Sequence, residues 1–228
     1  MVVFKIGIIL VAFFLFQISL AQEKDSISTL LDFHIKRDTV RSKHLIKASD
    51  YFTYSNPERA LKYINEGLLI ANDKNWEQGM ALALNQKGSI YYTMADNLKA
   101  LDFFLEALRI AEKIDDQNLV LNLYNNLANI YADMKDFNKA LKNYNNCLNI
   151  AIQRKDTINQ IRAYNNIGNV YSETNKVDKS LGYFDNALSL AKELDNSFFV
   201  AAIINNKGLA YKRKRDYQNS LMYAEIWL

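Results

Sequence analysis

The chain has 228 residues, half of them hydrophobic, and a formal net charge of +3 at pH 7. This hydrophobic fraction is enough to bury a continuous core. Helix-breaking residues are scarce, with seven glycines and one proline, which favours long helices. The one dense basic run, residues 212–215, is assigned to a helix end, where cations offset the negative end of the helix. No aromatic and basic platform accompanies the run, so we expect no nucleic-acid partner.

The N-terminal residues 1–21 have the features of an export signal. Lys5 supplies an early positive charge, residues 6–16 are apolar, and Ser19 and Ala21 place small side chains before a cleavage site at Gln22. The apolar stretch is also just long enough to span a bilayer, so an uncleaved anchor is the alternative. Either way we expect the rest of the chain in an extracytoplasmic space, periplasmic or secreted after cleavage and membrane-anchored without it.

Residues 22–40 form a polar lead-in before the main body of the chain. Apolar residues recur there at helical spacing, at Ile27, Leu30, Leu31 and Ile35. We expect these residues to form a short helix that covers the open end of the segment that follows.

Residues 41–228 repeat with a period of 40 residues. One slot always holds glycine or alanine, at Ala48, Gly88, Ala128, Gly168 and Gly208. The slot three residues later always holds tyrosine, at Tyr51, Tyr91, Tyr131, Tyr171 and Tyr211. A fixed period of this size predicts a solenoid in which each unit packs mainly on its neighbours. The predicted units are residues 41–80, 81–120, 121–160, 161–200 and an incomplete 201–228.

The second unit shows how one repeat is built. Its first helix, helix A, is predicted over residues 81–94, and its second, helix B, over residues 98–114. Asp96 or Asn97 is expected to cap helix B, and Asn56 is expected to cap the corresponding helix of the first unit. One face of helix A carries a large, a small and an aromatic residue, at Leu84, Gly88 and Tyr91. The predicted buried stripe of helix B is Leu101, Phe104, Leu105, Leu108 and Ala111.

These residues resemble the tetratricopeptide repeat, a helix-turn-helix unit with small and aromatic residues at fixed spacing. The motif residues in the second unit are Leu84, Gly88, Tyr91, Ala100, Phe104 and Ala107. The unit is longer than the usual 34 residues, which is similar to the kinesin light chain type, and residues 124–131 and 164–171 carry that similarity. The resemblance implies an all-α, right-handed superhelical solenoid of antiparallel helix pairs.

Residues 37–41 and 56–61 also resemble the start of extracytoplasmic sensor regions of bacterial histidine kinases and helix-turn-helix transcription regulators. The alternative function is therefore a truncated sensor region. Four residues of the last helix are predicted to face a place where a further helix should pack, namely Leu221, Tyr223, Trp227 and Leu228. We expect either self-association at this end or a longer protein.

Asparagine recurs on helix A although it is a mediocre helix former. The nine positions are Asn85, Asn125, Asn126, Asn129, Asn165, Asn166, Asn169, Asn205 and Asn206. The resemblance implies that these slots line the inner, concave surface, where amides can donate to and accept from the main chain of an extended peptide. The alternative is that each asparagine hydrogen-bonds to the neighbouring repeat, and the two roles are compatible.

No group of residues in the sequence predicts catalysis. His34 and His44 have no cysteine or histidine partner at metal-ligand spacing, and no nucleotide-binding or hydrolase motif occurs. Cys147 occupies the slot held elsewhere by small residues, Gly67, Ala107 and Ala187, which predicts a buried structural role. The sequence therefore predicts a non-enzymatic scaffold that needs no cofactor or metal and binds a protein or peptide.

Overall fold

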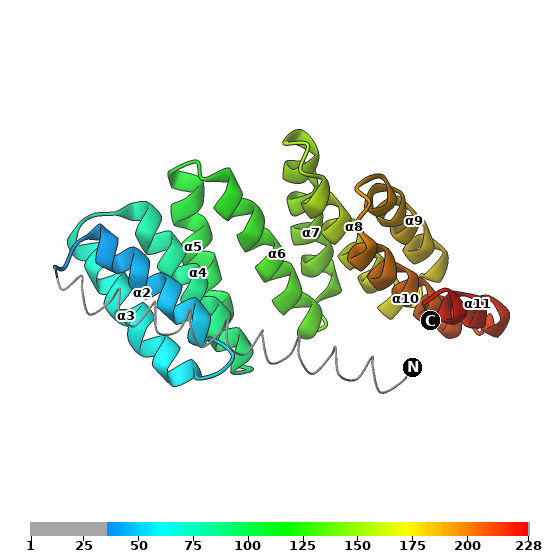
Figure 1. Cartoon of the computed structure of the whole chain (residues 1–228), viewed down its shortest axis with the longest axis horizontal. Coiled ribbons are helices and arrows are strands. Elements are labelled where there is room, and N and C mark those ends of the chain that lie inside the picture. The colour runs from blue at the N-terminus through cyan, green and yellow to red at the C-terminus, as the bar shows by residue number, and fades with distance from the viewer. Residues whose placement is uncertain (1–35, 228) are drawn as a thin grey trace, which may run out of the picture. The chain divides into compact units, whose positions relative to one another are not determined.

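The computed structural model describes residues 36–227, and every regular element in that range is an α-helix (Figure 1). The described helices are α2 (Thr39–Phe52), α3 (Pro57–Asp73), α4 (Glu77–Thr93), α5 (Asn97–Lys113), α6 (Gln117–Asp133), α7 (Phe137–Gln153), α8 (Thr157–Glu173), α9 (Val177–Glu193), α10 (Ser197–Arg213) and α11 (Tyr217–Trp227). The predicted export signal, the predicted helix at residues 27–35, His34 and Leu228 lie outside the described residues, as does the side chain of Trp227. None of the helices α2 to α11 is both long and apolar enough to cross a bilayer.

From α4 to α11, each helix begins 20 residues after the one before it, and a three-residue link follows each helix from α3 to α10. The middle residue of each link has a positive φ between 50° and 62°, at Asn75, Ala95, Asp115, Lys135, Lys155, Asn175, Asp195 and Arg215. The next residue donates its backbone N–H to a carbonyl five residues earlier, as Asp96 does to Tyr91 at 2.9 Å. This is the Schellman arrangement, which satisfies carbonyls at the end of a helix.

The last residue of most links also caps the following helix. Its side-chain carboxylate or amide oxygen accepts a hydrogen bond from a backbone N–H in the first turn of that helix, at 3.0–3.2 Å. The capping residues are Asn56, Asp96, Asp116, Asp136, Asp156, Asn196 and Asp216. The caps predicted at Asn56 and Asp96 are therefore confirmed. Helix A of the second repeat, α4, begins at Glu77 rather than at residue 81, directly after Trp76, which provides no side-chain cap.

The described residues form two compact units, residues 36–110 and residues 111–227. In the first unit, α2 packs against α3 and α3 packs against α4 (Figure 1). In the second unit, each helix from α6 to α10 packs against the next one in the chain. Each unit is thus a stack of sequential antiparallel helix pairs, which confirms the predicted all-α, tetratricopeptide-like solenoid class.

The core of a repeat depends on the small-residue slot of helix A. A Cβ added to Gly88 would lie 2.7 Å from the ring of Phe104, and one added to Gly168 would lie 2.6 Å from the ring of Phe184. Both rings are fully buried. Because interiors are close-packed, the missing side chain is what lets each ring lie against the backbone of its partner helix.

Two predicted positions differ in the structure. Leu105 was predicted in the buried stripe of α5, but it is 44 % exposed, since an i, i+4 pattern does not fix the width of the buried face. Tyr223 was predicted to face an absent helix, but its ring stacks on Tyr211 within the α10–α11 pair at 5.4 Å. Leu221 does have an exposed side chain, at 64 %, as predicted.

The small-residue slot can be tested with two glycines of the second unit. We expect Gly168→Ala to destabilise the protein by about 1–3 kcal/mol, because the new methyl group must displace the ring of Phe184. Gly182→Ala should stabilise it by about 0.5–1 kcal/mol, because Gly182 lies inside α9 and an added Cβ would meet no described atom within 4 Å. Urea denaturation followed by circular dichroism measures both, and equal effects would contradict the packing argument.

Candidate functional site

The nine asparagines of the predicted site all lie on the first helices of repeats. Asn85 is on α4 in the first unit, and the other eight are on α6, α8 and α10 in the second unit. Eight of the nine side chains are half-buried, and Asn205 is exposed. Partial burial suits amides that contact the protein on one side and leave polar atoms accessible on the other.

Two asparagine pairs connect neighbouring repeats in the second unit. The side-chain Nδ2 of Asn206 on α10 donates to Oδ1 of Asn165 on α8 at 2.9 Å. In the same way, Nδ2 of Asn166 on α8 donates to Oδ1 of Asn125 on α6, at a longer 3.4 Å. Four of the nine predicted residues therefore bond to a neighbouring repeat.

The bonds between repeats leave hydrogen-bonding capacity on each amide. An asparagine has two N–H donors and an oxygen with two lone pairs. The pair of Asn165 and Asn206 uses one N–H of Asn206 and one lone pair of Asn165. Each pair can therefore fix its own orientation and still donate to or accept from a third group, so the two predicted roles do not compete.

Asn129 and Asn169 occupy the same slot of consecutive repeats but have different surroundings. The hydroxyl of Tyr144 on α7 donates to Oδ1 of Asn129 at 2.6 Å. In the next repeat the residue equivalent to Tyr144 is Phe184, which has no hydroxyl. Asn129 therefore anchors a buried tyrosine, whereas Asn169 is the better candidate of the two for an external ligand.

Charged residues on the same helices are partly committed to contacts within the protein. Glu173 at the end of α8 pairs with Lys135, in the link after α6, at 3.1 Å. Arg162 on α8 is exposed, and its guanidinium lies 5.9 Å from the ring centroid of Phe199. Since Arg162 lies one helical turn before Asn165 and Asn166, it is the charged side chain best placed to add selectivity beside the amides.

Lys207 is a buried lysine that the sequence pattern did not single out. Its slot holds Lys47 and Lys87 in the first two repeats and Leu127 and Ile167 in the next two. The ammonium of Lys207 donates to Asp185 at 2.5 Å and lies 4.9 Å from the ring centroid of Tyr223. Burial alone would lower the pKa of Lys207, yet its hydrogen bonds with Asp185 and Tyr223 outweigh burial and raise that pKa. Lys207 therefore stays charged and ties α10 to its neighbours.

The described residues offer little for catalysis. No group of three or more histidine, cysteine, aspartate or glutamate side chains within residues 36–227 is placed to hold a metal ion. Cys147 is buried, as predicted, and this burial raises the pKa of its thiol to about 11. At neutral pH the side chain is a thiol rather than the nucleophilic thiolate, so Cys147 acts as a small core residue.

A hollow in the first unit was not predicted from the asparagine pattern. It has a volume of about 350 Å3 and lies among α3, α4 and α5, and its lining residues are Asn65, Leu68, Leu69, Asn72, Met80, Leu84, Phe103 and Glu106. The residue that could have revealed this hollow from the sequence is Leu69, because the same slot holds Arg109, Asn149 and Ser189 in the later repeats. An exposed leucine where other repeats are polar marks a local departure from the repeat.

The sequence matches the tetratricopeptide repeat family profile over residues 79–153 and again over residues 119–193. The two overlapping matches together cover about half of the chain. No curated protein matches the chain in sequence.

Several solved structures share the fold at low sequence identity. BtubC (BKLC) from P. vanneervenii superposes with a TM-score of 0.76 at 19 % identity, covering 92 % of this chain and 87 % of that one. A putative kinesin light chain from Podosopora anserina, with nearly identical TPR-like repeats, gives 0.71 at 11 %, covering 83 % and 93 %. A Rap protein complexed with Competence and Sporulation Factor gives 0.73 at 11 %, covering 92 % and 70 %. At these identities the likeness concerns the fold alone.

The amide pairing can be measured with a double-mutant cycle on Asn165 and Asn206. We expect the pair to contribute about 0.5–1.5 kcal/mol to stability, so the double alanine variant should lose less than the sum of the single losses. Asn205→Ala is the matched control, because Asn205 is exposed, and its effect should add to that of Asn165→Ala. Strict additivity for Asn165 and Asn206 in chemical denaturation would show that the pair is not formed in solution.

Proposed function

We propose that this chain, which belongs to the tetratricopeptide repeat family, is a non-enzymatic scaffold that binds an extended segment of a partner protein along α6, α8 and α10. The observation that carries the proposal is the repeated amide pairing on these three helices. The pairs hold half-buried amides in fixed orientations, and each amide keeps donors or acceptors for a further group. A site that is already ordered loses less conformational entropy when it binds.

The main chain of an extended peptide supplies the matching chemistry. It presents N–H and C=O groups at each residue, at a rise of about 3.3 Å. Asparagine amides satisfy both kinds of group and carry no charge, so they recognise the main chain largely independently of its side chains. Selectivity would then come from neighbouring groups such as Arg162, which is exposed.

The comparisons support this class of function. One similar structure is a Rap protein complexed with Competence and Sporulation Factor, in which a like fold holds a second molecule. The first expectation, a peptide-binding or protein-binding scaffold, is the proposal made here. The second expectation, a sensor region of a signalling kinase or transcription regulator, stays a prediction, as does self-association at α11.

The peptide site can be tested with peptides selected from a displayed random library against residues 22–228. Replacing Asn125, Asn165 and Asn205 by alanine together should weaken binding of a selected peptide at least tenfold, since each lost hydrogen bond contributes about 0.5–1.5 kcal/mol. Fluorescence anisotropy of a labelled peptide gives the affinity. Circular dichroism establishes the folded fraction at which affinities are compared.

The matched control for the peptide experiment is Asn149→Ala. Asn149 is an exposed asparagine on α7, the second helix of its repeat, and lies outside the proposed row. Its substitution should leave the affinity unchanged. If the triple variant binds as tightly as the wild type at matched folded protein, the asparagine row is purely structural.

We also propose that the chain is exported through residues 1–21. The support is the order of a positive charge, an apolar run and small residues at the cleavage position. In cells expressing the full chain, intact mass spectrometry should find a protein that begins at Gln22, and Ala21→Leu should block its appearance. A product of full mass that fractionates with membranes would instead support the uncleaved anchor.

A further inference from the structure

The hollow of the first unit is lined mainly by apolar side chains. Five of its lining side chains are apolar, at Leu68, Leu69, Met80, Leu84 and Phe103, and Asn65, Asn72 and Glu106 complete the lining. Leu69 remains 51 % exposed. An apolar hollow of about 350 Å3 has room for a few aliphatic side chains. We call this feature the α3–α5 groove.

The groove interrupts the repeat pattern of the chain. The slot of Leu69 holds Arg109, Asn149 and Ser189 in the following repeats, as expected for a position that faces water. The first repeat alone places a large aliphatic residue there. Leu69 is half exposed and borders an apolar hollow, so a further apolar group that contacted both would bury additional apolar surface.

We propose that the occupant of the α3–α5 groove is the segment 27–35 of this same chain. Its sequence carries apolar residues at helical spacing, at Ile27, Leu30, Leu31 and Ile35. The segment follows the predicted cleavage site before Gln22, so it remains in the protein whether or not the export signal is removed. The inference is independent of the proposed peptide site, which lies on other helices.

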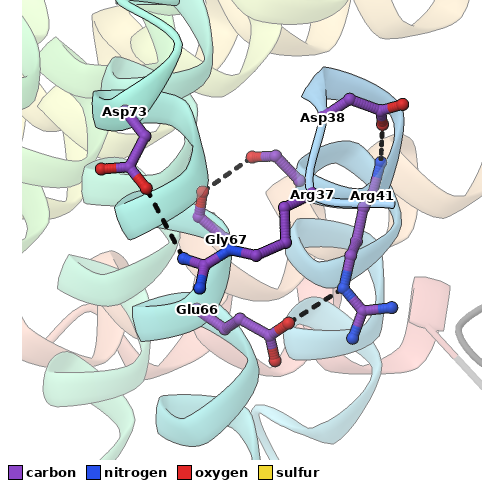
Figure 2. Close-up of polar contacts among 7 residues, drawn as sticks. Arg37, Asp38, Arg41, Glu66, Gly67 and Asp73 are labelled. Atoms are coloured by element: carbon purple, nitrogen blue, oxygen red, sulfur yellow. Dashed lines mark hydrogen bonds and ion pairs between the residues drawn. The ribbon is translucent and has the colours of Figure 1, made fainter. Parts of the chain in front are cut away.

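The first described residues fix where the chain enters α2, beside the end of α3 that borders the groove. The guanidinium of Arg37 lies 3.6 Å from the carboxylate of Asp73 at the end of α3, and Nε of Arg41 donates to Glu66 at 2.9 Å (Figure 2). The chain therefore enters α2 beside the C-terminal half of α3. Asn72, which lines the groove, directly precedes Asp73.

The available length is sufficient for this contact. The eight residues before Ile35 span about 12 Å as a helix and at most about 29 Å when extended. The groove is lined by the last turns of α3, from Asn65 to Asn72, and the entry point of the chain is fixed at the same end of that helix by Arg37 and Asp73. Leu30 and Leu31 lie near the middle of the segment and are the best placed to meet Leu69.

A disulfide trap tests the proposal on the chain that carries residues 22–228. Cys147→Ala removes the native thiol, and alanine already occupies the same slot at Ala107 and Ala187. In that background, Leu31→Cys with Leu69→Cys should form a disulfide within one molecule under mild oxidation. Leu31→Cys with Asn149→Cys is the matched control, because residue 149 is the equivalent slot two repeats later, and it should not cross-link.

The outcomes of the trap separate the possible occupants. A cross-linked monomer whose yield does not depend on protein concentration supports the proposal. Covalent dimers whose yield rises with concentration would overturn it in favour of a second copy of the chain in the groove. Yields at Leu69→Cys no higher than at the Asn149→Cys control would also overturn it.

A labelling experiment tests the same contact independently and needs no disulfide between the two thiols. With Leu69→Cys as the only thiol, replacing Leu30 and Leu31 by serine should raise the rate of maleimide labelling several-fold, because the apolar cover is lost. The same serine changes should leave the labelling rate of Asn149→Cys unchanged. An unchanged rate at residue 69, or a rise there no larger than the rise at residue 149, would overturn the proposal.

Discussion

The close approach of the two helices in a repeat is the contact on which the rest of the structure depends. In two repeats the approach requires glycine on the first helix, because the rings of Phe104 and Phe184 occupy the space where a Cβ would lie. Where the opposing residue is Ile64 or Tyr144, the slot holds alanine. The size of one side chain on each helix thus sets the spacing of the pair, and a close-packed interior transmits that spacing along the stack.

Because the helices have a constant length, equivalent residues of successive repeats occupy equivalent positions. Every helix from α3 to α10 has 17 residues and ends in a link of three residues. Each link contains one residue in the left-handed conformation and, in most cases, a polar cap for the next helix. Residues separated by 41 positions therefore meet in the same way at consecutive repeats, as the pairs Asn125–Asn166 and Asn165–Asn206 do. A row of like amides is a consequence of this regularity.

The amide pairs connect stability with the proposed binding. A residue that bonds to its neighbour and also faces a ligand contributes to both folding and recognition, so its substitution changes both quantities. Asn205, which is exposed, and Asn129, which anchors the hydroxyl of Tyr144, represent the two extremes of this range. The charged groups nearby also differ in this respect: Glu173 is paired with Lys135 within the protein, whereas Arg162 remains exposed.

The sequence by itself determined the features that depend on local chemistry and on period: the all-α class, the 40-residue repeat, the caps at Asn56 and Asp96, and the small buried slot of Cys147. Spacing along one helix is enough to predict these, because capping and amphipathicity act within a few residues. Only the tertiary structure decided which asparagines pair, that Leu105 is exposed, that Tyr223 stacks on Tyr211, and that Leu69 borders a groove. Each of these depends on which side chains from different helices meet in space, and a one-dimensional pattern does not contain that information.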